Sequence, residues 1–306
     1  MVGVVIDGVP AGIHLDTSDL EDDLARRKSG ARGTTPRREE DKPEIVAGVF
    51  EGHTTGAPIA ILFRNSDTRS GDYADTTQHP RPGHADMVAR QKWGGYSDYR
   101  GGGHFSGRIT LALVAAGAVA KKILPSGVAI DARITEIGGQ KDNFEQTIEG
   151  AIKAGDSVGG IVECTATGIP AGWGEPFFDS VESTLSHAVF SIPGIKGIEF
   201  GAGFAATGMT GSNHNDPITD KKGTTASNNA GGINGGIANG NPLVFRVVVK
   251  PTASISVQQQ TYDFRTGKVG ELVVKGRHDA CIALRVPVIV EAVTAIVLCD
   301  FMLLQD

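Results

Sequence analysis

An apolar segment rich in alanine, running from Ile109 to Lys122, constrains the fold of this chain more than any other feature. Its sequence, ITLALVAAGAVAKK, is long enough for a helix, and its small residues would let a neighbouring element pack closely against it. Lys121 and Lys122 end the segment, and cations suit the C-terminus of a helix because of the helix dipole. We therefore expect a helix here in close contact with another element.

A run of three glycines, Gly101 to Gly103, lies shortly before this helix. Glycines allow backbone N–H groups to approach a phosphate because no Cβ intervenes, and the N-terminus of a following helix adds partial positive charge. The run therefore predicts an anion-binding turn. A tight loop without a ligand is an equally good interpretation of three glycines taken alone.

Length and composition are those of a globular protein. The 306 residues, 40% of them hydrophobic, suffice for a sizeable core in one large domain or two. Acidic residues outnumber basic ones, 35 to 29, and the net charge of −6 argues against nucleic acid or a membrane surface as a general partner. Three widely spaced cysteines show no CxxC pattern, so we expect neither disulfides nor a metal site, and a cytoplasmic location.

The last apolar segment, Cys281 to Leu304, raises the question of a membrane span. Arg285, Glu291 and Asp300 interrupt it, so it lacks the uncharged run of about 18 residues that a transmembrane helix needs. We therefore predict a buried helix with Pro287 in its first turn, where proline is well tolerated.

Apolar periodicity and turn residues predict the remaining elements. We expect strands at Met1–Asp7, Glu44–Phe50, Ala57–Phe63, Gly127–Ile137, Gly160–Thr167 and Leu243–Val249, a hairpin at Gln258–Lys275, and helices in the acidic segment after Leu15 and at Phe144–Gly155. A further helix is expected with Asp179 as its cap and Glu182 at the capping-box spacing. Residues 201–241, dense in glycine and asparagine, are expected to be irregular, and loops of this length are usually functional or disordered.

Two further stretches are candidates for binding anions. Basic residues cluster between Arg26 and Arg38, either as a solvated charged face or as a mobile flap whose guanidinium groups pair with a polyanionic ligand. Lys250 to Ser254 places hydroxyls after a cation, which suits a clamp for a phosphate or a ribityl chain. An ordinary strand end would explain that second stretch equally well.

Four motifs follow one another along the chain: RPGHAD (Arg81–Asp86), YRGGGHFSGR (Tyr99–Arg108) with the alanine-rich helix behind it, KPTAS (Lys250–Ser254) and GRHD (Gly276–Asp279). In this order they make the chain resemble the chorismate synthase family over nearly its whole length. The resemblance implies an α+β fold, a β-α-β sandwich with helices packed between antiparallel sheets, formed as a single domain over residues 1–306 and assembled as a homotetramer. Family members usually carry an upstream Gly-Glu-Ser-His-Gly segment, and this sequence begins just after its expected position.

The resemblance also implies a reaction. Chorismate synthases are lyases that convert 5-enolpyruvylshikimate 3-phosphate into chorismate, the last common step of the shikimate pathway to aromatic amino acids, by a 1,4-trans elimination of phosphate. Reduced FMN assists this step without net redox change. NADPH would act only as an indirect reductant, and the lack of an added domain favours an external flavin reductase.

Residue roles follow from the same resemblance. His84 and Asp279 are the catalytic candidates, His84 because an imidazole titrates near neutral pH and Asp279 as a proton relay near the flavin. The residues expected to bind FMN are His104, Phe105, Ser106, Pro193, Gly194, Gly235, Lys250, Pro251, Thr252, Ala253, Ser254 and Arg277. Those expected to bind the substrate's anionic groups or NADP are Arg27, Arg32, Arg81 and Arg108, with Arg277 also near the substrate.

Other functions remain open at this point. The chain could be an N-terminally truncated FMN-binding homologue with weak or no activity, or a flavin- or nucleotide-binding protein without catalysis. A nucleic-acid-binding module based on Arg26 to Arg38 is the third alternative, but aromatic residues make up only 6% of the chain and no recognition motif accompanies the charges. We therefore expect an enzyme without nucleic acid or membrane partners.

Overall fold

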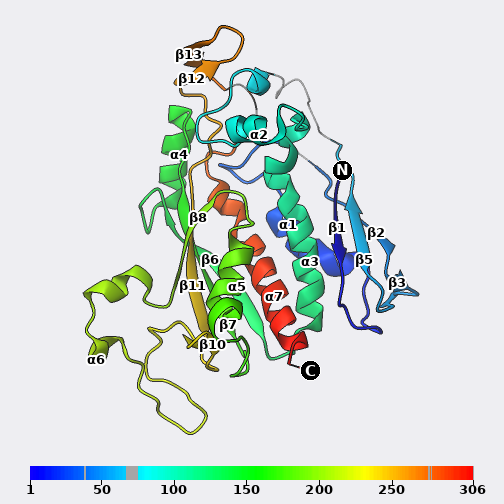
Figure 1. Ribbon diagram of the computed structural model, residues 1–306, viewed down its shortest axis with the longest axis vertical. Coiled ribbons are helices and arrows are strands. Elements are labelled where there is room, and N and C mark those ends of the chain that lie inside the picture. Colours follow the sequence, from blue (N-terminus) through cyan, green and yellow to red (C-terminus); the bar gives the residue numbers. More distant parts are fainter. Residues whose placement is uncertain (38, 67–74, 275, 277, 306) are drawn as a thin grey trace.

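The computed structural model describes residues 1–37, 39–66, 75–274, 276 and 278–305. Within these ranges the chain forms three layers, in which helices lie between two antiparallel sheets (Figure 1). Each sheet turns one apolar face to the helices, because a half-buried sheet must cover that face with another layer. This is the α+β sandwich that the family resemblance implies.

The order of elements along the chain agrees with the sequence analysis for most of its length. The helices are α1 (Glu21–Arg27), α2 (Asp86–Trp93), α3 (Thr110–Ile123), α4 (Phe144–Ala154), α5 (Val181–Val189), α6 (Gly211–His214) and α7 (Pro287–Leu303). The strands are β1 (Val2–Ile6), β2 (Pro43–Ala47), β3 (Val49–Phe50), β4 (His53–Thr54), β5 (Ile59–Phe63), β6 (Ala129–Ile137), β7 (Gly160–Thr167), β8 (Ile195–Phe200), β9 (Ile233–Asn234), β10 (Ile237–Ala238), β11 (Leu243–Val249), β12 (Gln259–Asp263) and β13 (Lys268–Leu272). Short 3₁₀ helices lie at Thr17–Leu20, Asp75–Thr77, Arg100–Phe105, Gly107–Ile109, Phe177–Asp179, Gly203–Gly208 and Ile282–Arg285.

The N-terminal sheet has the strand order β1-β5-β2, and both pairs are antiparallel. In β5 the side chains of Ile59, Ile61 and Phe63 are fully buried, whereas those between them are partly exposed. The strand predicted over Glu44–Phe50 is interrupted at Gly48. Its φ of +84° and its close approach to the backbone of Ile59 leave no room for a side chain.

The second sheet has the strand order β6-β7-β11-β8 and is antiparallel throughout. Leu243, Phe245 and Val247 alternate with partly exposed residues along β11 and belong to the core, as does Cys164 of the neighbouring strand β7. Helices α5 and α7 cover this face of the sheet (Figure 1). The core therefore lies between the sheets, around the helices.

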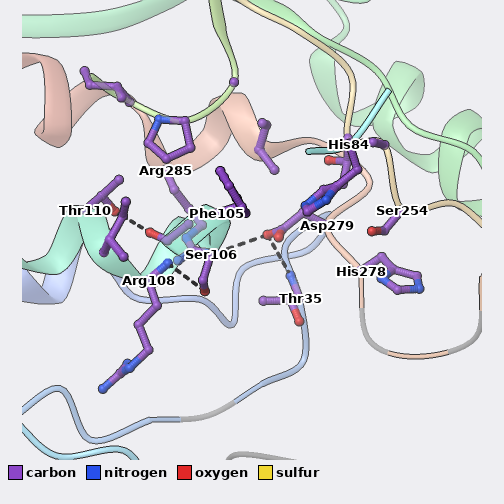
Figure 2. A pocket seen from close by; sticks show the side chains of 18 of the residues that line it. Thr35, His84, Phe105, Ser106, Arg108, Thr110, Ser254, His278, Asp279 and Arg285 are labelled. Carbon is purple, nitrogen blue, oxygen red and sulfur yellow. Dashed lines mark hydrogen bonds and ion pairs between the residues drawn. The ribbon is translucent and has the colours of Figure 1, made fainter. Parts of the chain in front are cut away.

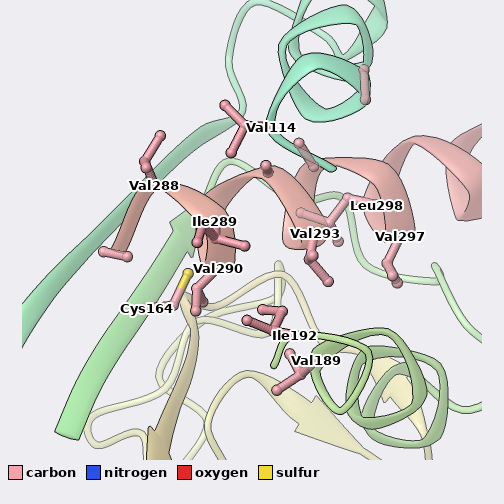
Figure 3. Close-up of a cluster of buried hydrophobic side chains, with 14 of the residues drawn as sticks. Val114, Cys164, Val189, Ile192, Val288, Ile289, Val290, Val293, Val297 and Leu298 are labelled. Atoms are coloured by element: carbon pink, nitrogen blue, oxygen red, sulfur yellow. The ribbon is translucent and has the colours of Figure 1, made fainter. Parts of the chain in front are cut away.

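Helices α3 and α7 form the centre of the middle layer and pack along each other. Gly117 of α3 approaches α7 so closely that an added Cβ would lie 2.3 Å from the Cβ of Ala292. The small residues of α3 thus permit the close contact that the sequence predicts. Figure 3 shows Val114 of α3 and Val189 of α5 on either side of the apolar helix α7.

The predicted cap of α5 is wrong by one residue. Ser180, not Asp179, is the N-cap, and its Oγ accepts a hydrogen bond of 3.0 Å from the N–H of Ser183. Asp179 is the last residue of the preceding 3₁₀ helix, so its backbone does not take the extended conformation that an N-cap needs. Glu182 is consequently one residue too early for a capping box.

The C-terminal helix and the irregular segment both lie where the sequence places them. Helix α7 begins at Pro287 and most of its side chains are buried, as predicted. None of the helices in the described ranges combines the length and the apolar character needed to cross a bilayer. Residues 201–241 contain only short elements and project from one end of the sandwich, whereas hairpin β12–β13 lies at the other end (Figure 1).

Candidate active site

A cavity of about 710 Å³ lies where α3 and α7 begin (Figure 2). Its walls combine the segment after α1, the residues that lead into α3, the connection between α5 and β8, the segment after β11 and the turn before α7. Ligand sites in proteins commonly have volumes of roughly 300–1,000 Å³. The cavity therefore has room for one or two small organic ligands.

One wall contains a histidine held by a carboxylate. Asp86 accepts two hydrogen bonds from the guanidinium of Arg81, at 2.7 and 2.8 Å, and its Oδ1 lies 2.7 Å from Nδ1 of His84. The ionised carboxylate of Asp86 can only accept, so Nδ1 of His84 carries a proton and donates to it, even though Nη2 of Arg81 lies 3.0 Å from the same nitrogen. No described residue bonds to Nε2. Burial opposes ionisation of Asp86, but hydrogen bonds from Arg81 and His84 outweigh it and hold the pKa of Asp86 below its usual range.

Two buried arginines share one carboxylate at the base of the cavity. Nη1 of Arg27 lies 3.3 Å from Oδ2 of Asp41, and Arg108 bonds to the other oxygen of the same carboxylate. Arg27 also donates to Oγ1 of Thr110 at 3.0 Å. Burial and the nearby Arg285 lower the pKa of Arg27 to about 9. An arriving anion would therefore relieve an unfavourable concentration of positive charge.

Asp279 lies just before the 3₁₀ turn that leads into α7. Its Oδ1 accepts a hydrogen bond of 3.0 Å from the N–H of Thr35 and lies 3.3 Å from Nη1 of Arg285 (Figure 2). No residue in the described ranges donates to its Oδ2. The carboxylate is thus anchored through one oxygen, and the other remains available to a ligand.

The segment after β11 supplies a cation and hydroxyl groups. Nζ of Lys250 donates to the carbonyl oxygen of Gly83 at 2.6 Å, and burial, with Lys196 nearby, lowers the pKa of Lys250. Oγ of Ser254 accepts a hydrogen bond of 2.9 Å from Arg81. Oγ1 of Thr252 is buried without a hydrogen-bond partner among the described residues. Such unsatisfied hydroxyls are uncommon in native proteins, and a ligand atom here would complete the site.

Positive charge predominates in the cavity. Among the described residues that line it, seven are lysine or arginine and three are aspartate or glutamate. The cations are Arg27, Arg37, Arg81, Arg108, Lys196, Lys250 and Arg285, and the carboxylates are those of Glu39, Asp41 and Asp279. The cavity is therefore suited to a ligand with several negative charges, although the chain as a whole is acidic.

Most residues singled out in the sequence come together here. Those that line the cavity are Arg27, Arg81, His84, His104, Phe105, Ser106, Arg108, Pro193, Gly194, Lys250, Thr252, Ala253, Ser254 and Asp279. Gly235 and Pro251 are exposed and do not line it. Arg32 does not line it either, because it pairs with Glu149 at the surface, Nη2 to Oε2 at 2.8 Å. Arg277 lies outside the described residues.

Two structural expectations for this region need correction. Arg27 is not part of a mobile flap: it belongs to α1, and its side chain is 2% exposed. The three glycines form part of a 3₁₀ helix, Arg100–Phe105, and Gly103 does not line the cavity. Gly103 has a φ of +53°, and an added Cβ would lie 2.1 Å from the carbonyl oxygen of Asp98, so local packing explains this glycine.

Sequence reasoning missed several polar residues of the cavity. Arg285 interrupts an apolar segment, and a charge in such a segment is itself a signal of a buried polar contact. Arg37 lies within the basic cluster, where no local feature distinguishes it from the other arginines. Lys196 and Thr35 had no sequence signal, because only the tertiary fold brings them to the cavity.

Comparisons with known proteins agree with this geometry. The family model described as chorismate synthase matches residues 1–303. The chain belongs to the chorismate synthase family.

Curated relatives support the assignment along the whole chain. A chorismate synthase of Chitinophaga pinensis is 64% identical over 305 residues, covering 100% of this chain and 92% of the relative. One from Pyrococcus abyssi is 45% identical over 330 residues, covering 99% of this chain and 93% of the relative. A crystal structure of a chorismate synthase has a TM-score of 0.74 and 27% identity, covering 99% of this chain and 88% of that one. Family membership makes the chain an enzyme of the lyase class.

Proposed function

We propose that this chain catalyses the conversion of 5-enolpyruvylshikimate 3-phosphate into chorismate by 1,4-trans elimination of phosphate, with reduced FMN as cofactor. The observation that carries the proposal is the excess of cations around His84 and Asp279 in a member of this family. The substrate carries a phosphate and two carboxylates, up to about four negative charges. Seven cationic side chains against three carboxylates in the cavity complement that charge.

The residues of the cavity fit FMN. Thr252 offers a buried hydroxyl without a partner among the described residues, and Ser254, Ser106 and the cation Lys250 line the same cavity. These groups would hold the phosphate and ribityl chain, and the apolar ring of Phe105 would contribute to the pocket for the flavin. When bound, reduced FMN would supply electron density that eases the loss of phosphate.

Arginines would hold the substrate in a fixed orientation. Arg27 and Arg108 are anchored by Asp41, and Arg81 is anchored by Asp86, so none of these guanidinium groups has to be immobilised when the ligand arrives. Anions held at such preorganised donors lose little additional entropy on reaching the transition state. The anchoring carboxylates thus act on the substrate through the arginines.

His84 and Asp279 would handle protons. Because Nδ1 of His84 donates to Asp86, its Nε2 is the atom that would exchange a proton within the cavity. Oδ2 of Asp279, which receives no hydrogen bond from the described residues, would accept or relay a second proton. Both groups line the cavity, from which bound ligands would exclude water.

Other properties follow from the family. We propose that residues 1–306 act as one domain, that the chain assembles as a homotetramer, and that it works in the cytoplasm with reduced FMN from an external reductase, NADPH being an indirect source of electrons. The three cysteines are all free and buried, which agrees with a reducing compartment.

The direct test is anaerobic incubation of the protein with chemically reduced FMN and 5-enolpyruvylshikimate 3-phosphate. We expect chorismate and inorganic phosphate in equal amounts, and no net consumption of reduced flavin. Arg133→Met is a suitable control. Arg133 pairs with Glu163 on the outer face of the sheet, so this variant should have normal turnover. Flavin binding without product from either protein would instead indicate a homologue that has lost catalysis.

A further inference from the structure

Arg285 lines the cavity but has no part in the roles assigned above. Its Nε donates to the carbonyl oxygen of Arg27 at 3.2 Å, and its Nη1 lies 3.3 Å from Oδ1 of Asp279. The side chain is 17% exposed, so most of it is fixed within the protein. One guanidinium therefore connects the end of α1 with the carboxylate that precedes α7.

This connection fixes the orientation of the Asp279 carboxylate. Oδ1 accepts hydrogen bonds from the N–H of Thr35 and from Nη1 of Arg285, whereas Oδ2 accepts none within the described part of the chain. A single backbone donor would leave the carboxylate free to rotate about that bond. Two donors from different segments fix its plane, and with it the direction of Oδ2.

We propose that Arg285 is a positioning residue for the elimination, which holds Asp279 so that Oδ2 is presented to the reacting groups. The inference rests on the function proposed above. Arg285 acts through Asp279, because its Nη1 bonds to that carboxylate while its Nε is held by the carbonyl oxygen of Arg27. Arg27, Arg81 and Arg108 remain to hold the substrate's anionic groups.

The geometry also explains why a lysine at position 285 could not make both hydrogen bonds of the guanidinium. The two acceptors, the carbonyl oxygen of Arg27 and Oδ1 of Asp279, belong to segments far apart in the sequence. A planar guanidinium reaches both with a fixed angle between its donors, whereas an ammonium group is a point charge at the end of a flexible stem. Arg285→Lys should keep the positive charge but lose the orientation of the carboxylate.

The test compares Arg285→Met, Arg285→Lys, Asp279→Asn and the double variant Arg285→Met/Asp279→Asn, with Arg133→Met as the control. For Arg285→Met we expect kcat to fall by about 10²-fold, the loss typical of a misplaced reacting group. KM should change by less than about threefold, because an interaction that acts only in the transition state affects kcat and not binding. Arg285→Lys should lie between the parent and Arg285→Met.

The double variant is the decisive measurement. If Arg285 acts only through Asp279, the double variant is no slower than Asp279→Asn alone, because the orientation of a missing carboxylate no longer matters. Losses that multiply would overturn the proposal, and so would a large rise in KM with unchanged kcat, which would make Arg285 a direct ligand of the substrate.

Melting temperature and FMN affinity, measured by flavin fluorescence, separate positioning from folding. A lowered melting temperature with normal kcat in the folded fraction of Arg285→Lys would show a structural role and overturn the inference. Absence of chorismate from the parent and from Arg133→Met would contradict the proposed function itself. An active parent with fully active Arg285 variants would contradict only the role of Arg285.

Discussion

Arg26 and Arg27 are neighbours in α1, yet they belong to two different clusters of charged side chains. Arg26 donates to both oxygens of Glu291 at 2.6 Å, and Lys121 lies 3.2 Å from the same carboxylate. Arg27 faces the cavity, where other arginines surround it. The hydrogen bonds to Glu291 raise the pKa of Arg26, whereas burial and Arg285 lower that of Arg27.

The difference separates a structural cluster from a functional one. Around Glu291 each charge has a partner within the chain, and the carboxylate also accepts the N–H of Ala132 at 3.1 Å. Around Arg27 the protein supplies more positive than negative charge. Balanced buried charges hold elements together, and unbalanced ones mark a place where a ligand completes the balance.

The largest effect is expected in the balanced cluster. Glu291→Gln should lower the free energy of unfolding by about 1.5–3 kcal/mol, because it weakens the charged hydrogen bonds that the buried carboxylate accepts from Arg26 and Lys121, whose own side chains are partly exposed. Urea denaturation measures this loss, and FMN affinity should be unchanged in the folded protein. A change below about 1 kcal/mol would mean that solvent already compensates the pair.

The same cluster predicts a dependence on pH. Burial disfavours the ionised form of Glu291, but hydrogen bonding by Arg26 and the charge of Lys121 outweigh it and lower its pKa from the ordinary value of 4.5. The ionised form is therefore favoured by folding, and its contribution is present above 4.5 and lost as pH falls below that value. Denaturation curves of the parent and Glu291→Gln should accordingly converge on acidification. If the difference in stability between the two proteins stayed constant down to low pH, ionisation of Glu291 would not be the source of that difference.

His84→Ala tests the functional side of the comparison. We expect turnover to fall by roughly one to three orders of magnitude, because Nε2 is lost as a proton donor and acceptor. Melting temperature and FMN affinity should stay close to those of the parent, because Arg81 still holds Asp86 without the imidazole. Anaerobic single-turnover rates measure the change. A normal rate in a destabilised protein would make His84 a structural residue.

Arg27→Met and Arg26→Met form a matched pair on one helix. Arg27→Met should weaken substrate binding by roughly 10- to 100-fold, since charged hydrogen bonds of this kind contribute about 1.5–3 kcal/mol. Its stability should change little, because removing the cation also relieves repulsion from Arg285 and Arg108. Arg26→Met should show the reverse pattern, with reduced stability and normal KM. Identical behaviour of the two variants would remove the distinction between the clusters.

The smallest effect is expected at Arg32. Its side chain is 73% exposed and pairs with Glu149 outside the cavity, so Arg32→Met should alter KM by no more than about twofold. Steady-state kinetics would show this directly. A rise in KM comparable to that of Arg27→Met would support the sequence-based assignment of Arg32 to substrate or NADP binding, and would require the segment after α1 to move when the ligand binds.

Most helices and strands were predictable from local patterns, whereas their arrangement as a sandwich was implied only by the family resemblance. Alternation along Ile59–Phe63 and the small residues around Gly117 each determine one buried face, and these faces require a layered core. The cap of α5 was not predictable in detail, because Asp179 and Ser180 are both good capping residues and only the preceding 3₁₀ helix decides between them.

The candidate site was predictable where its residues belong to one short motif. It was not predictable where a side chain pairs with a residue far away in the sequence. The order Arg81, His84, Asp86 already suggests a hydrogen-bonded group. Helix periodicity alone does not show that Arg27 and not Arg26 faces the cavity, because successive residues on a helix point about 100° apart and the direction is set by packing. Only the family resemblance singled out Arg27. The capture of Arg32 by Glu149, 117 residues away, is likewise a result of the tertiary fold.

The contact between Gly117 and Ala292 has a consequence for engineering. Alanine is preferred over glycine in helices by about 1 kcal/mol, so a routine search for stabilising substitutions would select Gly117→Ala. At this position the added methyl group would collide with Ala292 and push α3 away from α7. Arg108 precedes the first turn of α3 and Arg285 precedes that of α7, so the displacement would spread to both sides of the cavity. Gly117 lies outside the cavity, yet a substitution chosen there to increase heat resistance would instead disturb the arginines at the start of both helices.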